Sequence, residues 1–307
     1  MMNVIVRRWL PYIAIIVAMI IWATAGIATK IALTGFLPIS LVTCRFALAV
    51  LLMLIIGLAT SSLVKPQKKD LPLFLLAGFF QPFCYFLLET FGMKLIASPT
   101  IAEVLLCTSP LFAPIFAWIF LKENISKYNI IGIVLSSLGV FYIIAFQSQS
   151  FALGNPWAVP LLLLAVFSAV SYTILLRKIP LRYNNLSTIL YIQSSSLLFF
   201  IPLWLITDFK QFVQLSAIFN LNALYAVIYL ALFSSVIAFV LFSYVVRQIG
   251  VTRANAFNNI RPVFTAIIML IAFNEQLPWQ KWVAMIVVII GLFICQKQEK
   301  TEKITKK

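Results

Sequence analysis

The 307-residue sequence contains no histidine, few charged residues and only four cysteines. Without histidine, neither a metal site nor a proton relay can use an imidazole. The cysteines stand singly in apolar stretches, without the CxxC spacing of a zinc or redox site, so we expect no metal and no cofactor. No GxxxxGK[ST] sequence is present that would bind the phosphates of ATP. These absences argue against an enzyme, and any energy for transport would have to come from a gradient or from exchange.

Hydrophobic residues make up 63% of the chain and charged residues only 10%. Soluble domains carry about 25% charged residues, so the composition indicates an all-α integral membrane protein. Ten apolar segments are each about as long as a membrane-crossing helix. The predicted spans are residues 10–29, 38–58, 71–93, 98–121, 128–146, 157–176, 186–206, 222–246, 251–273 and 280–296.

Lysine and arginine are distributed unevenly between the predicted loops. If the N-terminus is cytoplasmic, most of the 23 basic residues fall in cytoplasmic segments, and only Lys30, Lys94, Lys210 and Lys281 fall outside. Because basic residues favour the cytoplasmic side, we predict that both termini are cytoplasmic and that the protein lies in the inner membrane. This distribution accounts for the net charge of +15 without a nucleic-acid partner.

The two halves of the sequence are related. A shift of 152 positions aligns Thr100 with Thr252, Pro110 with Pro262, Glu123 with Glu275 and Gly139 with Gly291. We therefore predict a first five-helix repeat over residues 1–149, a second over 150–296 and a charged cytoplasmic tail over 297–307. Because five is odd, the second copy must be inserted upside down relative to the first. Inverted repeats are typical of secondary transporters, in which the substrate binds between the halves near the middle of the membrane.

Four charged side chains fall within the predicted spans, namely Arg45, Glu89, Glu103 and Arg261. Ionisable residues inside a membrane are costly and are candidates for function. Two hypotheses stay open. The charges form structural salt bridges, Arg45 with Glu89 or Glu103 with Arg261, or at least one carboxylate contacts substrate or carries a proton. Glu89 and Glu103 are the candidate proton carriers.

Polar residues share one face of each of three predicted helices. Lipid cannot satisfy such a face, so we predict a polar-lined central cavity. The candidate cavity residues are Trp22, Tyr85, Glu89, Glu103, Tyr172, Asn255, Asn258, Asn259 and Arg261. For the asparagines, interhelical hydrogen bonding alone is the alternative. Pro110 and Pro262 are candidate helix-kink residues, and the spacing of Gly132, Ser136 and Gly139 predicts a close-packing face.

Short motifs are spread along nearly the whole chain. They are Trp22-Ala23 with Lys30, Pro38 with Arg45-Phe46, Glu89 to Gly92, Pro110 with Lys122-Glu123, Gly132 with Gly139, and Pro262, Glu275 and Gly291 in the second half. Combined with the five-plus-five repeat, they resemble the ten-helix EamA branch of the drug/metabolite transporter superfamily. The resemblance implies a secondary carrier, often an exporter of amino acids and related metabolites. It also implies that helices 1, 3, 4, 6, 8 and 9 surround the cavity and that the pairs 3/4 and 8/9 rock during alternating access.

We therefore expect a secondary active transporter of small organic metabolites, foremost an exporter of amino acids, because Arg261 and Glu103 would complement a zwitterion. One alternative is a multidrug-type proton antiporter for organic cations. Another is a non-transporting membrane receptor or scaffold. The expected partners are a small-molecule substrate, protons as coupling ion and the lipid bilayer, without an obligate protein partner.

Overall fold

The computed structural model describes residues 4–95, 105–145, 155–215, 220–273 and 279–297, and every element in these ranges is helical. The elements are α1 (Val4–Ala32), α2 (Pro38–Ala59), η1 (Lys68–Asp70), α3 (Leu71–Gly78), η2 (Phe79–Cys84), α4 (Tyr85–Leu95), α6 (Ser109–Leu121), α7 (Lys127–Ala145), α8 (Ala158–Lys178), α9 (Asn185–Thr207), α10 (Phe209–Leu215), α11 (Leu221–Tyr229), η3 (Leu230–Ile237), α12 (Ala238–Ile249), α13 (Val251–Ala256), η4 (Phe257–Ile260), α14 (Arg261–Phe273) and α15 (Trp279–Gln296).

Six of the described helical stretches are long and apolar enough to cross a membrane. They are Trp9–Thr29, Pro38–Ala59, Lys68–Gly92, Ala158–Lys178, Asn185–Thr207 and Leu221–Ile249, and three shorter apolar helices accompany them. The bounds of α2, α8 and α9 lie within two residues of the predicted ranges 38–58, 157–176 and 186–206. The short helix α10, in the predicted loop after residue 206, was not foreseen because it is too short to show a hydrophobic period.

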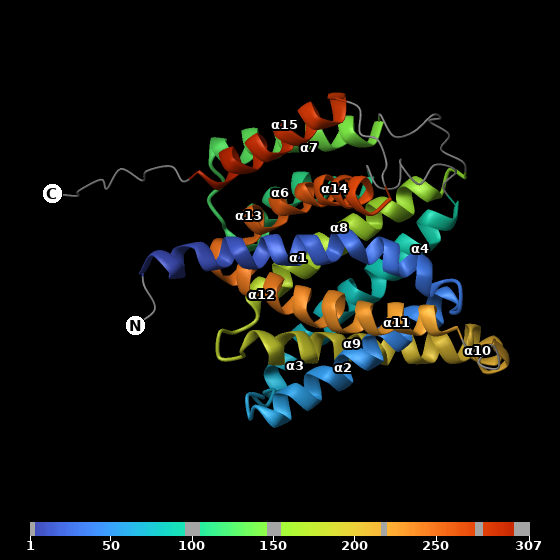
Figure 1. The fold of residues 1–307 in the computed structure, drawn as a ribbon. Helices are drawn as coiled ribbons and strands as arrows, with labels where there is room; N and C mark the ends of the chain where they lie inside the picture. The colour runs from blue at the N-terminus through green and yellow to red at the C-terminus, as the bar shows by residue number, and fades with distance from the viewer. Residues whose placement is uncertain (1–3, 96–104, 146–154, 216–219, 274–278, 298–307) are drawn as a thin grey trace.

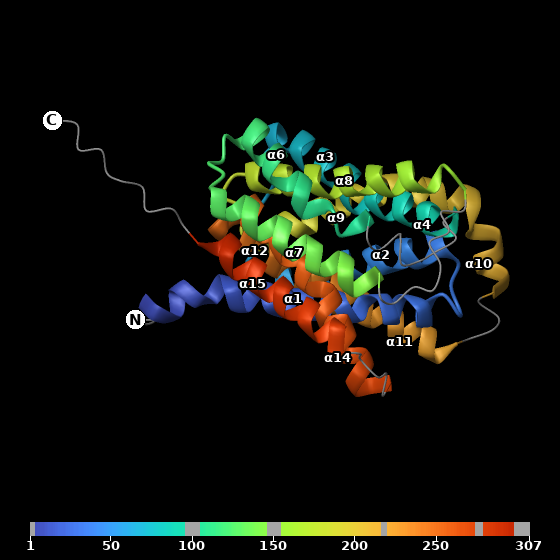
Figure 2. The same cartoon turned by 90° about the horizontal axis from the view of Figure 1, so that it is seen from above.

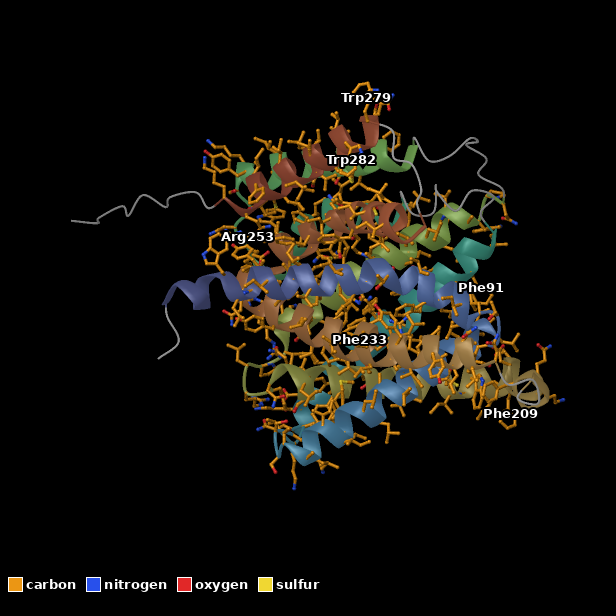
Figure 3. All side chains as sticks on the ribbon, viewed as in Figure 1. Phe91, Phe209, Phe233, Arg253, Trp279 and Trp282 are labelled. Carbon is orange, nitrogen blue, oxygen red and sulfur yellow. The ribbon has the colours of Figure 1, made fainter. Side chains whose placement is uncertain are left out.

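The helices form a bundle in which α1 begins and α15 ends at the same end (Figures 1 and 2, left). We call this the terminal end of the bundle. Arg253 lies there, whereas Phe91 and Phe209 lie toward the opposite end (Figure 3).

Hydrogen bonds and an ion pair connect described loops at each end of the bundle. At the terminal end, Arg182 pairs with Asp70 and the Glu123 carboxylate accepts a hydrogen bond from Val251 N. At the other end, the Asp208 carboxylate accepts a hydrogen bond of 2.9 Å from Ser40 N.

Interruptions of the helices recur along the chain with the 152-residue shift found in the sequence. The segments α6 and α14 begin at Ser109 and Arg261, which are 152 residues apart. The kink in η2, where Gln81 has an extended backbone (φ −148°, ψ 119°), also overlaps the π-helical segment η3 after the same shift. The places where the backbone departs from a regular α-helix are therefore related between the two parts of the chain.

The two candidate kink prolines each occupy the second position of a helical segment. Pro110 follows Ser109 in α6, and Pro262 follows Arg261 in α14. In the first turn of a helix a proline loses no hydrogen bond, because that N–H has no partner inside the helix. A turn at Cys107–Thr108 precedes α6, and the 3₁₀ segment η4 precedes α14. The prolines thus start new segments after a break and do not bend an unbroken helix.

Glycines bring α7 and α15 into backbone contact. A Cβ atom added at Gly291 would lie 2.5 Å from Ser136 N and 2.8 Å from Gly132 O. One added at Gly139 would lie 2.7 Å from a methyl group of Val288. Small residues allow such close approach between helices in membranes. The close-packing face predicted at Gly132, Ser136 and Gly139 is confirmed, and its partner is α15.

Candidate substrate site

Tyr85 and Glu89 form the first part of the candidate site. They lie one turn apart on α4, which directly follows the kinked segment η2, and both are half-buried. The Tyr85 hydroxyl donates a hydrogen bond of 3.1 Å to Glu89 Oε1. Residues four apart on a helix lie on the same face, so the hydroxyl holds the carboxylate in one orientation. The two residues present a polar, negatively charged face among apolar helices.

Arg261, the first residue of α14, lies within electrostatic range of Tyr85, as does Cys107 in the turn before α6. The Nε atom of Arg261 is buried and has no hydrogen-bond partner among the described residues. A buried guanidinium N–H needs a hydrogen-bond acceptor. We call Tyr85, Glu89, Cys107 and Arg261 the Tyr85 cluster. It joins α4 to the interrupted regions before α6 and α14.

Arg45, on α2, binds η3. Its Nε donates to Ser235 Oγ at 2.7 Å and its Nη2 donates to Ser234 Oγ at 2.9 Å. Its guanidinium carbon lies 5.3 Å from the centroid of the Phe46 ring and 5.0 Å from that of Phe86, a cation–π distance. Arg45 is 6% exposed. The side chain is therefore bound on several sides by protein, as a buried charge requires.

Glu89 is the carboxylate within electrostatic range of Arg45. The predicted salt bridge between these two charges stays a prediction. Glu89 lies within electrostatic range of Arg45 and accepts a hydrogen bond from Tyr85, so it stands between Arg45 and the Tyr85 cluster.

Two more side chains bind the backbone of η3. Trp22 Nε1, on α1, donates to Ser234 O at 3.2 Å, and Gln193 Nε2, on α9, donates to Ser235 O at 2.6 Å. A π-helical turn leaves carbonyl groups without their usual partner in the helix. Side chains from α1, α2 and α9 therefore converge on one irregular stretch and fix it in place.

The rings of Trp22 and Tyr172 pack against α12. Trp22 lies 5.4 Å from Phe239 and 5.3 Å from Phe242 between ring centroids, and Tyr172 lies 6.2 Å from Phe239. Tyr172 is 1% exposed, and its hydroxyl has no hydrogen-bond partner among the described residues. The structure thus brings these two predicted cavity residues together through Phe239.

The three candidate asparagines have different surroundings. Asn259 is fully buried and donates to Ser136 Oγ at 2.8 Å and Ser137 Oγ at 3.1 Å, both on α7. For Asn259 the structure therefore supports the interhelical alternative, because its amide is directed at α7. Asn255 Nδ2 donates to Val251 O, and Asn258 Nδ2 donates to Asn255 Oδ1 at 3.4 Å. Asn258 is half-buried. Glu103 lies outside the described residues.

Sequence reasoning missed Ser234 and Ser235 as partners of the central polar residues. The available signal was the adjacent pair of serines within an apolar span. Their role depends on Arg45, which is about 190 residues away in the chain, so no local pattern could reveal it.

Comparison with known proteins decides the family. The sequence profile of the EamA-like transporter family matches residues 9–145 and again residues 156–295. The chain belongs to the EamA-like transporter family. As a member of this family it is a multi-pass protein of the inner membrane.

Several relatives of this EamA-like transporter cover nearly its whole length. An uncharacterized transporter of Archaeoglobus fulgidus is 25% identical over 288 residues, which is 94% of this chain and 98% of the relative. The uncharacterized inner membrane transporter YedA of Escherichia coli is 25% identical over 94% of this chain and 91% of its own. A "probable terminal-alkyne amino-acid exporter" of Streptantibioticus cattleyicolor is 24% identical over 86% of each chain.

A solved crystal structure has the same fold. It superposes with a TM-score of 0.74 at 18% identity, covering 92% of this chain and 95% of its own. At this identity the likeness concerns the fold alone.

Proposed function

We propose that this EamA-like transporter is a secondary active exporter of amino acids or related small metabolites that works by alternating access. In this proposal ten spans form two inverted five-helix repeats, residues 1–149 and 150–296, with both termini cytoplasmic. Three findings support it. The family profile matches twice along the chain, the helix breaks recur with the 152-residue shift, and the basic residues favour the terminal end as the cytoplasmic side.

The observation that carries the proposed substrate class is the Tyr85 cluster. It holds a carboxylate, Glu89, and a guanidinium, Arg261, whose buried Nε has no partner among the described residues. A free amino acid carries one charge of each sign, so a site with both signs satisfies it and leaves neither charge buried alone. The related exporter that is named for an amino acid supports the same class.

In the proposed mechanism, Arg261 donates hydrogen bonds to the substrate carboxylate, and Glu89 accepts one from the substrate ammonium. Tyr85 keeps the Glu89 carboxylate oriented through its hydroxyl. Trp22, Tyr172 and Asn258 remain candidates for the wall around the rest of the substrate. Protonation of Glu89 would remove the charge that holds the ammonium, so Glu89, and Glu103 with it, remain the proposed proton carriers.

The test uses proteoliposomes loaded with the twenty amino acids and with amines that lack the carboxylate. We expect efflux of one or more amino acids, and efflux of the matching amine about 10–100-fold slower, because the amine leaves Arg261 without its acceptor. Arg261→Gln should slow amino-acid efflux to a similar degree. Arg253→Gln is the matched control, because Arg253 lies at the terminal end of the bundle, away from the Tyr85 cluster (Figure 3).

Other outcomes would favour the alternatives. Efflux of lipophilic organic cations that is unchanged in Arg261→Gln would contradict the amino-acid proposal and support a multidrug-type antiporter. A folded protein that moves none of these compounds would support a receptor or scaffold. An imposed pH gradient that leaves the flux of a transported amino acid unchanged would remove protons as the coupling ion.

A further inference from the structure

The loop after α6 is built to direct one carboxylate at the second part of the chain. Lys122 ends α6 in the left-handed conformation, with φ 53° and ψ 35°. Glu123 N donates to Ala117 O at 3.2 Å, six residues back, which satisfies a carbonyl at the end of the helix. Few residues other than glycine adopt a positive φ. This turn reverses the chain and points the Glu123 side chain toward the start of α13.

The Glu123 carboxylate binds the start of α13 with both oxygens. Oε1 accepts from Val251 N at 2.9 Å. Oε2 accepts from Thr252 N at 3.2 Å and from the Thr252 hydroxyl at 2.9 Å. Hydrogen bonds to an ionised carboxylate are about twice as strong as those between neutral groups. Three of them converge here from two adjacent residues.

Gly250, the residue before α13, leaves room for the Glu123 carboxylate. Gly250 has a φ of +87°, which residues with a side chain rarely adopt. A Cβ atom at Gly250 would also overlap Glu123 Oε1. The backbone conformation and the space beside the carboxylate therefore both require glycine. We call the contact of Glu123 with Val251 and Thr252, with Gly250 beside it, the Glu123 clasp.

The clasp connects the two proposed repeats where their interrupted helices meet. Glu123 follows α6, which starts after the turn at Cys107–Thr108. Val251 and Thr252 begin α13, a short segment separated from α14 by the 3₁₀ segment η4. Arg261 of the Tyr85 cluster begins α14, so α13 and η4 connect the clasp to the proposed site. The segments α6 and α13 pack against each other, and the clasp fastens this contact.

We propose that the Glu123 clasp is a latch that closes the cytoplasmic end of the transport pathway, and that it must open before the site can face the cytoplasm. This inference rests on the proposed alternating access. The turn before α6 and the 3₁₀ segment η4 between α13 and α14 give α6 and α13 each a place to pivot. The clasp would stabilise the conformation in which the pathway is closed to the cytoplasm and bias the resting protein toward it.

The test reads opening directly, without a substrate. In a variant with Cys44, Cys84 and Cys295 changed to serine, half-buried Cys107 of the Tyr85 cluster is the remaining thiol. A membrane-impermeant maleimide is added to inside-out vesicles, and the rate of Cys107 labelling is measured. Glu123→Gln, which weakens all three hydrogen bonds, should raise the rate about tenfold, as expected for the loss of ~1.4 kcal/mol.

Two further variants test whether the change in the Cys107 labelling rate comes from the clasp. Thr252→Val removes only the hydroxyl bond to Glu123 and should raise the labelling rate less than Glu123→Gln does. Asp208→Asn is the matched control, because Asp208 likewise binds a helix start, at Ser40 N, but lies at the opposite end of the bundle. It should label at the rate of the parent. Gel filtration and thermal unfolding of each variant show that it is folded.

The possible outcomes distinguish a failure of the latch proposal from a failure of the proposed substrate class. Faster labelling in Glu123→Gln supports the latch even if no amino acid is exported, and then only the substrate class fails. A folded Glu123→Gln variant that labels at the parental rate overturns the latch, even if amino-acid efflux is confirmed. Equal acceleration in Asp208→Asn would also overturn it, because the effect would then reflect general loosening of the bundle.

Discussion

Replacing Gly291 by alanine should separate α15 from α7. The new Cβ atom would lie 2.5 Å from Ser136 N, 2.8 Å from Gly132 O and 2.9 Å from Ser136 Cα, whereas ordinary contacts begin at 3.4 Å. All three neighbours belong to the backbone, so no side chain can turn aside. Because the interior is close-packed, the helices would have to move apart by about 1 Å.

Two opposing effects set the size of the change. Overpacking of this kind costs about 1–3 kcal/mol. A helical glycine replaced by alanine gains about 0.5–1 kcal/mol from the smaller loss of backbone entropy. Gly26, on α1, provides the matched control because a Cβ there meets nothing within 4 Å. Gly26→Ala shows the entropic gain alone, so the difference between the two variants isolates the overlap at α7.

Thermal unfolding in detergent, followed by a thiol-reactive dye that labels the four cysteines as they become exposed, gives the measurement. Gly291→Ala should melt several degrees below Gly26→Ala, since 1 kcal/mol corresponds to about 2–4 °C in a chain of somewhat smaller size. If the two variants melt at the same temperature, the backbone contact between α7 and α15 does not exist in the protein.

Two other changes test the centre and one end of the bundle. Arg45→Met should lower the free energy of unfolding by about 3 kcal/mol, because it removes the charge that binds Ser234 and Ser235 and lies near Glu89. Arg45→Lys, measured in the same melts, should recover part of this loss. Asn184→Ala should cost about 1 kcal/mol, because its side chain accepts a hydrogen bond of 2.7 Å from Ser187 N at the start of α9.

Each of these predictions has a contrary result. A folded Arg45→Met variant as stable as the parent would mean that η3 does not depend on α2. An Arg45→Lys variant equal to the parent would show that the charge alone matters, and not the fork of donors. Asn184→Ala with unchanged stability would place the start of α9 outside the cooperative unfolding unit.

Hydropathy predicted the helices well because burial in lipid imposes a simple requirement on each one. A segment must be apolar and long enough, and both properties are local. This is why the ranges predicted for α2, α8 and α9 differ from the structure by two residues at most. The close-packing glycines of α7 could be predicted for the same reason, since their spacing lies within one helix.

Irregular stretches could not be predicted in the same way. The kinked segment η2 and the π-helical segment η3 differ in sequence, and η3 contains no proline. Its geometry is fixed by Arg45, Trp22 and Gln193, which come from three other helices. Such partners are distant in the chain, so the sequence around η3 gives no sign of them.

In the candidate site, sequence analysis predicted which residues lie on polar helix faces but not which neighbours they contact. Polar faces singled out Tyr85, Glu89 and Arg261. Tyr85 donates a hydrogen bond to Glu89, and Arg261 lies within electrostatic range of Tyr85. The same reasoning grouped Asn259 with them, although its amide binds Ser136 on α7. A helical face specifies a direction around the axis but not which neighbour stands there. The neighbour follows only from the packing of the bundle.

The backbone contact between α7 and α15 has a practical consequence. Helices that touch through side chains can slide as rotamers change, but helices that touch through backbone atoms leave no such slack. The pair would therefore keep a constant spacing through the transport cycle. Spectroscopic labels placed one on each helix would act as an internal ruler, against which the displacement of any other helix could be calibrated in the same sample.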